Sequence, residues 1–327
     1  LVMAAAYASY TEKSFSVWSS PKISVLQGNI PQNQKWDEKY SGEIISIYGK
    51  LTEEASREGA DLIVWPETAY PYLVVSPEEE PKEVKDDAKK YGIPILAGAV
   101  CAVGENYYNS AILYDKEGKV VSIYNKTHLV PFGEYIPCGK YLDCLRNYID
   151  KPIGSFTRGS ELKLFSLNTS SDTAKNPDVI IRKTNFNKFG VLICFEDIFP
   201  YLTREFVGRG ANFMINITND AWFGETAASR QHLQASVFRA VENRIPVIRA
   251  ANTGVSCFID PSGRITSSVE QGGKEIFVRG ISTANINIIK QKARYTLYGD
   301  VFVQFSLIML IVIGVTGTLL RKIRRGY

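Results

Sequence analysis

Near its end the chain has a run of twenty residues without a charge, Val301 to Leu320, in which Gln304 is the one strongly polar side chain. At about 1.5 Å per residue, a helix of this length covers a hydrocarbon core of about 30 Å. The basic string RKIRR follows at once, and Lys and Arg that flank a span are held on the cytoplasmic side. The run therefore predicts a membrane helix over 301–320, a basic cytoplasmic tail over 321–327, and an outward-facing domain before them. The alternative is a helix buried in the core of the domain.

The charge of the chain is concentrated in that tail. Its four basic residues account for the whole formal net charge of +4, so the residues before the tail are formally neutral. A nucleic-acid surface needs a basic stripe on the fold itself. We therefore expect no nucleic-acid partner. The 327 residues, 45% of them hydrophobic, are enough for one large globular domain.

The first residues form a short apolar segment, LVMAAAYASY. It is too short to span a bilayer and lacks the charged start of a signal peptide. We interpret residues 1–21 as the remnant of a preceding membrane helix and its linker. A short interfacial or disordered terminus is the alternative.

Residues 22–285 alternate between strand and helix patterns, and residues 286–300 are expected to link them to the membrane helix. The alternation predicts an α/β domain in which helices cover the sheets, although it does not decide between one sheet and two. Helices are expected at 36–58, 81–90, 200–207 and 226–243. Strands are expected at 22–30, 61–65, 93–103, 109–114, 119–124, 179–184, 189–194, 211–217, 247–251 and 255–259.

Three of these predicted strands lead to a polar residue at their carboxyl ends, where open α/β folds place their sites. Glu67 follows the run DLIVW and Pro66, and Lys126 follows the strand at 119–124. Because Pro66 cannot continue a sheet ladder, it carries Glu67 out of the sheet. Cys194 ends its strand and leads into a turn and a helix, whose positive end and any nearby ammonium favour a thiolate.

These three residue types suit acyl transfer. Cys194 can attack a carbonyl and hold the acyl group as a thioester, Glu67 can move protons, and Lys126 can stabilise the thiolate and the oxyanion. The chain has only His128 and His232, so mechanisms with a histidine base have few candidates. Taken singly, the three residues fit a core thiol, a loop carboxylate and a surface charge. The combination in the order Glu, Lys, Cys indicates a catalytic site.

The combination resembles the carbon–nitrogen hydrolase (nitrilase) superfamily, whose members carry such a triad on an αββα sandwich. Glu67 in WPET, Lys126 in YNKTHLVPFGEY and Cys194 in ICFED match its three motifs. Glu134 in the Lys segment matches a second glutamate that supports the lysine and the intermediate. The resemblance covers about residues 22–284 and implies a nitrilase-like αββα sandwich with this catalytic triad, with no cofactor and no metal.

Within the superfamily the sequence is most similar to the apolipoprotein N-acyltransferase branch. The strings QGNIPQNQKWD, NKTHLVPFGEYIP, TNDAWFG and RAANTGVS are typical of it, as is a membrane helix directly after the domain. The resemblance implies that an acyl chain passes from a phospholipid to Cys194 and then to the α-amine of the diacylglyceryl-cysteine of an apolipoprotein. It implies a bacterial plasma (inner) membrane protein with its catalytic domain on the extracytoplasmic face.

The same resemblance gives roles to four more residues. Trp36 and Trp222 match aromatic positions near the acyl chain or the lipid, and the alternative for both is a core or interface tryptophan. Glu196 matches a position that is important in the branch, and the alternative is a helix N-cap carboxylate. Phe195 stands where many relatives have Tyr, so a hydroxyl beside the nucleophile is missing. Phe195 and Glu196 are expected to support the nucleophile.

The spacing of the cysteines leaves their pairing open, and the sequence is compatible with two other functions. The five cysteines include no pair with zinc-ligand spacing, and their odd number leaves at least one free thiol. Cys138 and Cys144 can pair in an oxidising compartment or stay unlinked. A membrane-anchored amidase or nitrilase that uses water is one other function. A catalytically inactive domain that binds lipoproteins or lipids is another, although the intact triad argues against it.

Overall fold

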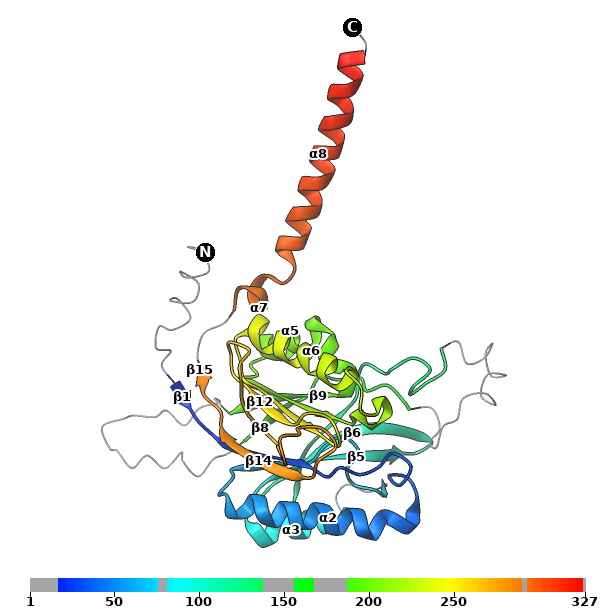
Figure 1. Ribbon diagram of the computed structural model, residues 1–327, viewed down its shortest axis with the longest axis vertical. Coiled ribbons are helices and arrows are strands. Elements are labelled where there is room, and N and C mark those ends of the chain that lie inside the picture. The colour runs from blue at the N-terminus through cyan, green and yellow to red at the C-terminus, as the bar shows by residue number, and fades with distance from the viewer. Residues whose placement is uncertain (1–16, 76–80, 138–155, 168–186, 290–292, 326–327) are drawn as a thin grey trace, which may run out of the picture.

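The computed structural model describes residues 17–75, 81–137, 156–167, 187–289 and 293–325. In this part of the chain two sheets pack face to face, and helices cover the outer side of each (Figure 1). The predicted αββα sandwich is confirmed. The question of one sheet or two, which the alternation of elements left open, is answered by the two separate strand ladders.

The first sheet has the strand order β14-β2-β3-β5-β6-β7, and β4 pairs with β5 at its side. The strands β2, β3 and β5 are parallel, whereas β6 is antiparallel to β5 and β7 is antiparallel to β6. Strand β7 therefore runs in the same direction as β3. The strands are β2 (Lys22–Gln27), β3 (Leu62–Val64), β4 (Leu73–Val74), β5 (Ile95–Val103), β6 (Asn106–Tyr114), β7 (Val120–Asn125) and β14 (Gly280–Asn285).

The second sheet has the order β13-β12-β11-β10-β9-β8, with β9, β10 and β11 parallel. The rings of Phe165, Phe189 and Phe213 stack across the three neighbouring strands β8, β9 and β10, with centroids 5.2 and 5.0 Å apart. The strands are β8 (Leu164–Ser166), β9 (Lys188–Ile193), β10 (Phe213–Thr218), β11 (Val247–Ala251), β12 (Cys257–Ile259) and β13 (Ile265–Ser268).

The helices bury the apolar stripes that their sequences predict. On the first sheet lie α2 (Glu38–Arg57) and α3 (Lys82–Tyr91), and on the second lie α5 (Pro200–Gly208) and α6 (Ala228–Asn243). Helix α2 starts at the N-cap Asp37 and buries Ile44, Tyr48 and Leu51. Tyr48 stacks on Trp65 at 4.8 Å, directly after β3. This packing fixes the end of the strand that leads to Glu67.

Several elements differ from the expectation. The predicted strand at 179–184 and the cysteines at 138 and 144 lie outside the described residues. Strand β14, which pairs antiparallel with β2, was not predicted, because it is half-buried and its sequence lacks the alternation of apolar and polar residues. Likewise β1 (Val17–Ser19) pairs with β15 (Ile288–Ile289), so segments expected to be linkers at the two ends of the domain form a small sheet.

After the short helix α7 (Arg294–Tyr298), helix α8 (Val301–Arg325) extends away from the domain (Figure 1). Over residues 301–321 it is long and apolar enough to cross a membrane, with a mean hydropathy of 2.2, and none of it is buried. It is the one helix with these properties in the part of the chain that the structure describes. The alternative of a core helix is therefore wrong.

Candidate active site

The three residues singled out at strand ends come together in space. Glu67 follows β3, Lys126 follows β7 and Cys194 follows β9. Because β3 and β7 run in the same direction, their ends lie at one edge of the first sheet, where β9 of the second sheet also ends. All three side chains line one cavity of about 330 Å³ and are buried, at 7%, 1% and 9% exposure. The topology thus places a carboxylate, an ammonium and a thiol in one pocket.

The backbone at Glu67 bends sharply against the neighbouring strand. Thr68 has a positive φ of 44°, which is uncommon for a β-branched residue. A Cβ at Gly98 of β5 would lie 2.2 Å from the Pro66 carbonyl oxygen and 2.7 Å from the Cα of Glu67. Glycine is therefore required at position 98 because the bend that carries Glu67 lies directly against it.

We predict that Gly98→Ala lowers the free energy of unfolding by about 1–3 kcal/mol, since the added methyl meets backbone that cannot turn aside. It should also lower activity, because a shift of the bend displaces the side chain of Glu67 from the site. Gly42→Ala is the matched control: it lies in α2, and a Cβ there meets nothing within 4 Å. Thermal unfolding of both variants checks this, and equal stability of Gly98→Ala and the wild type would contradict it.

Lys126 sits in a network of buried polar groups. Its Nζ donates to Oε1 of Glu134 at 2.9 Å, and its main-chain N–H donates to the carbonyl of Asn109. Asn109 Nδ2 in turn donates to Oε1 of Glu67 at 2.7 Å and to Oε1 of Glu134 at 3.2 Å. Burial alone lowers the pKa of Lys126, but the charges of Cys194, Glu134 and Glu67 outweigh it and raise that pKa. Lys126 is thus a fixed ammonium.

Cys194 occupies a strained elbow between β9 and the short 3-10 helix η3 (Cys194–Ile198). Its φ is 53°, a left-handed conformation that a non-glycine residue adopts only where its surroundings impose it. Asn216 on β10 donates from Nδ2 to the Cys194 carbonyl at 3.1 Å. The side chain is thereby directed into the cavity instead of the sheet core.

The electrostatics of Cys194 correct one expectation. The sequence led us to expect a stabilised thiolate, but burial and then the Glu67 carboxylate raise the pKa of Cys194, and Lys126 only partly offsets them. The helix after Cys194 is a single 3-10 turn, too short to supply much of a dipole. The resting site therefore holds a thiol, and its attack requires a base.

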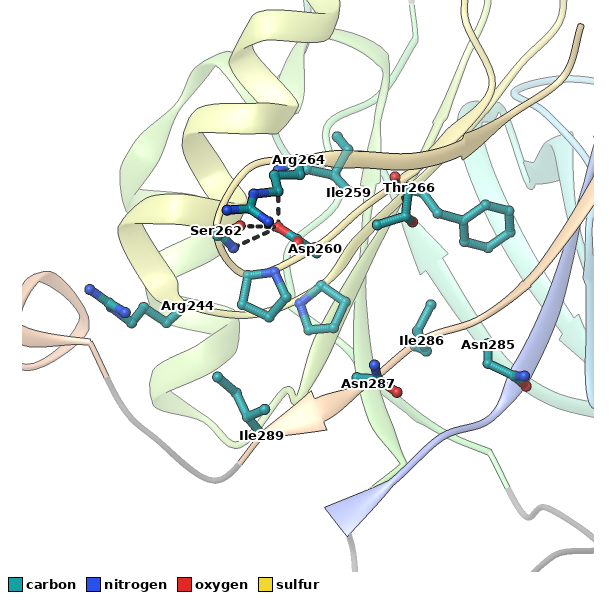
Figure 2. Close-up of a pocket in the computed structure, with 13 residues that line it drawn as sticks. Arg244, Ile259, Asp260, Ser262, Arg264, Thr266, Asn285, Ile286, Asn287 and Ile289 are labelled. Carbon is teal, nitrogen blue, oxygen red and sulfur yellow. Dashed lines mark hydrogen bonds between the residues drawn. The ribbon is translucent and has the colours of Figure 1, made fainter. Parts of the chain in front are cut away.

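A larger cavity of about 510 Å³ lies elsewhere, between the β12–β13 turn and β15 (Figure 2). Its one carboxylate, Asp260, accepts hydrogen bonds from the main-chain N–H groups of Ser262 and Arg264 within its own turn. It has no nucleophilic thiol, so we do not place the chemistry there. Among the described residues no His, Cys, Asp or Glu side chains form a group of three or more that could hold a metal ion.

Comparison with known proteins identifies the family of the chain. The model of the carbon–nitrogen hydrolase family matches residues 22–291. The chain belongs to the carbon–nitrogen hydrolase family. The match starts at the first residue of β2 and includes Glu67, Lys126 and Cys194. It ends after β15, before the apolar helix α8.

Similar sequences and structures agree with this family. Apolipoprotein N-acyltransferase of Geobacter metallireducens is 37% identical over 86% of this chain and 50% of its own length. That of Brucella melitensis is 39% identical over 76% of this chain and 45% of its own. The chain thus spans about half the length of these relatives. A branch 10 nitrilase-superfamily member from Saccharomyces cerevisiae shares the fold at a TM-score of 0.59 and 19% identity, covering 84% of this chain and 91% of that one. An amidase from Nesterenkonia does so at 0.57 and 18%, covering 90% and 98%.

Glu196 does not line the cavity of this family member. It is fully buried, and burial raises its pKa, against the hydrogen bonds that its carboxylate accepts. The donors are the main-chain N–H groups of Ile193, Thr127 and His128, at 2.9, 2.7 and 2.9 Å, with the hydroxyls of Thr127 and Tyr124. These bonds join the end of β9 to the segment after β7. Glu196 therefore does more than cap the turn in which it lies. It also fixes the position of Cys194 relative to Lys126.

Six aromatic rings contribute to the wall of the cavity. Trp36 is half-buried and Trp222 is 62% exposed, and both line the cavity, so Trp222 is not a core tryptophan. Phe195 also lines it and stacks on His232 with centroids 4.7 Å apart. Three more rings complete the wall, those of Phe132, Phe156 and Phe223.

A buried charge cluster behind the elbow gave no signal in the sequence. The guanidinium of Arg249 on β11 contacts Asp197 Oδ2 at 3.1 Å and Asp220 Oδ2 at 3.0 Å. His232 lies between the same carboxylates at 2.9 and 2.8 Å. Since Asp197 is part of η3, the cluster anchors the turn that carries the thiol. Asn109, Asn216 and Lys35 were also missed, because a neutral amide or a lone lysine has no motif of its own.

Proposed function

We propose that this carbon–nitrogen hydrolase family member is an N-acyltransferase. It moves an acyl chain from a phospholipid, through a thioester on Cys194, to the α-amine of the diacylglyceryl-cysteine of an apolipoprotein. The observation that carries the proposal is the buried group of Glu67, Lys126 and Cys194 at an aromatic-walled cavity. The substrate class is supported by the relatives that are named apolipoprotein N-acyltransferase.

In the first half-reaction Glu67 takes the proton from the Cys194 thiol. The sulfur attacks the carbonyl carbon of the phospholipid ester, and the tetrahedral oxyanion is stabilised by the ammonium of Lys126. The C–O ester bond breaks, and Glu67 returns its proton to the departing oxygen. A lysophospholipid leaves, and the acyl group remains on sulfur. The raised pKa of Cys194 is the reason that a base is needed here.

In the second half-reaction the neutral α-amine attacks the thioester carbon. Glu67 takes a proton from the attacking nitrogen, the C–S bond breaks, and the proton returns to the Cys194 sulfur. An amide forms and the thiol is restored. Glu134 holds Lys126 in place throughout by the 2.9 Å ion pair, and Asn109 keeps Glu67 beside it.

The surroundings of the site fit a lipid donor. Trp36, Trp222 and Phe195 give the cavity an apolar wall that suits an acyl chain. We propose that α8 spans the membrane over 301–320, that residues 321–327 are cytoplasmic, and that the catalytic domain over 22–285 lies on the extracytoplasmic face of the bacterial inner membrane. Residues 286–300 are proposed to link the domain to α8.

We predict that Lys126→Ala lowers the rate of Cys194 acylation by about 10²–10³-fold or more, because the oxyanion loses its ammonium. Phospholipid binding, measured with a non-cleavable ether lipid, should weaken much less. Lys119→Ala, which removes a lysine at the end of the β6–β7 connection, is the control and should change neither. Equal losses in rate and binding in Lys126→Ala would mean that Lys126 only holds the headgroup.

The proposed function is tested with the protein in detergent, a phospholipid and a synthetic peptide that begins with diacylglyceryl-cysteine. We expect the peptide to gain one acyl mass, and the same peptide with an acetylated α-amine to gain none. Release of free fatty acid without peptide acylation, or rapid cleavage of small amides, would instead favour a hydrolase that uses water. Binding of the peptide without either reaction would favour an inactive binding domain.

A further inference from the structure

A second lysine is buried next to the candidate site. Lys35 lies just before α2, is only 4% exposed, and donates from Nζ to the main-chain carbonyl of Glu67 at 2.9 Å. Among the described residues no carboxylate lies within 4.0 Å of this ammonium. Lysine is almost never buried to this extent without a partner for its charge. We therefore look for the partners of this buried charge among the charged groups of the site.

Without Lys35, the site has more buried carboxylates than ammonium groups. Asn109 Nδ2 bonds to both Glu67 and Glu134, so the two carboxylates lie close together. Lys126 forms its ion pair with Glu134. One ammonium beside two buried carboxylates leaves the group with a net negative charge, which opposes the formation of a further anion at Cys194. Lys35 brings a second ammonium to the Glu67 side of the group.

The electrostatics agree with this arrangement. Burial lowers the pKa of Lys35 to about 8, while the charges of Glu67 and Cys194 act in the opposite direction. The ammonium form therefore predominates at neutral pH. Lys126 and Cys194 also lie in the field of the Glu67 charge, Glu134 shares the Asn109 amide with Glu67, and Asp220 acts on Cys194 from η4 (Asp220–Phe223).

The Glu67 bend is held from two sides. Gly98 on β5 lies directly against its backbone, and Thr68 has a positive φ. On the other side the hydrogen bond from Lys35 holds the carbonyl between Glu67 and Thr68. Lys35 itself does not line the cavity, whereas its neighbour Trp36 does.

We propose that Lys35 is a positioning residue that holds Glu67 in place to receive the Cys194 proton and, through its charge, favours the loss of that proton. The inference rests on the proposed role of Glu67 as the base. Lys35 acts through Glu67 and needs no contact with the lipid or the peptide. Its charge and its hydrogen bond have separable effects, because one sets protonation and the other sets position.

The test is the pH dependence of Cys194 alkylation by iodoacetamide, followed by mass spectrometry of the tryptic peptide 189–204. Lys35→Met and Lys35→Gln should move the midpoint of the rate–pH curve upward by about one pH unit, and lower the rate near pH 7 by about tenfold. Lys35→Gln can still donate to the Glu67 carbonyl, so a shift in it reports the charge alone. Lys35→Arg keeps the charge and should stay near the wild-type midpoint.

Lys39→Met is the matched control, because Lys39 is an exposed lysine at the start of α2 that pairs with Asp37. Thermal unfolding shows which variants fold. If Lys35→Met does not fold, the comparison of Lys35→Gln with Lys35→Arg carries the test. A lower plateau with an unchanged midpoint in Lys35→Gln would overturn the proposal, as would an equal shift in Lys39→Met.

Iodoacetamide needs neither phospholipid nor lipoprotein, so the outcome is independent of the acyl substrate. An upward shift in Lys35→Gln, in a protein whose wild type fails to acylate Cys194 from phospholipid, supports the role of Lys35 and contradicts the acyltransferase. Acylation from phospholipid with no shift in Lys35→Gln supports the acyltransferase and overturns the role of Lys35.

Discussion

Cys194→Ala should abolish acyl transfer to the peptide, with a loss on the order of 10⁴-fold or more, down to the uncatalysed background. The reason is that the proposed reaction forms a covalent bond to the Cys194 sulfur, and no other thiol lines the cavity among the described residues. Binding of phospholipid should be retained, because the apolar wall is unchanged. Transfer is measured from the acyl mass gained by the peptide.

The fold of this variant should be preserved. Alanine at position 194 keeps the Cβ and leaves the backbone carbonyl that Asn216 holds, so thermal unfolding should shift little. Cys101→Ala is the matched control, since Cys101 is a buried free thiol on β5 outside the cavity. It should keep its activity. Substantial turnover by Cys194→Ala, or an equal loss in Cys101→Ala, would contradict the assignment of the nucleophile.

Glu67→Gln should lower the rate of Cys194 acylation by about 10²–10⁴-fold at neutral pH, the usual contribution of a positioned base. The substitution keeps an oxygen that can accept from Asn109, so the network stays in place while the base is lost. The thiol, whose pKa is raised, then has to lose its proton to solvent. Because that loss grows with hydroxide concentration, the remaining rate should rise about tenfold per pH unit across the alkaline range.

The wild-type rate should instead change little over this range, because the thiol proton passes to Glu67 and not to hydroxide. Stopped reactions over a series of pH values, analysed by intact mass, give both curves. Glu53→Gln on the exposed face of α2 is the control, since Glu53 pairs with Arg57 at the surface. A Glu67→Gln protein with the wild-type rate and the wild-type pH curve would exclude Glu67 as the base.

Much of this site could be predicted from the sequence because its residues follow strands with strong signals. DLIVW and GVLI are short, mainly apolar runs of strand length that indicate buried strands, and they lead to Glu67 and Cys194. The predicted boundaries of β11 at 247–251 match the structure, and those of β3 and β9 differ from it by one residue at each end. The order Glu, Lys, Cys then led to the family.

The rest depends on contacts between distant segments, which leave no pattern in the sequence. Lys35 and Glu67 meet only because the segment before α2 folds over the end of β3. Glu196 looks like a capping carboxylate next to Cys194, and its bonds to the segment after β7 appear only in the folded chain. The protonated state of Cys194 follows from burial and from the neighbouring carboxylate, which spacing cannot report.

The edge strands were missed for a different reason. Strands such as β13 and β14 are only partly buried, so they need no alternation of apolar and polar residues. Such strands form because a neighbouring strand of the sheet offers hydrogen-bond partners, and their own sequence does not report this. In the same way, a charged residue such as Arg249 is not expected in an apolar strand. Its position is explained by the ion pairs with Asp197 and Asp220, which only the folded chain shows.

The central claim is that Cys194 carries the acyl group, and intact-protein mass spectrometry after incubation with phospholipid in detergent tests it most directly. The account predicts one added acyl mass, located on the peptide 189–204, removed by hydroxylamine and discharged by a diacylglyceryl-cysteine peptide. No adduct on that peptide under conditions in which the diacylglyceryl-cysteine peptide is acylated, or an adduct that persists in Cys194→Ala, would contradict it.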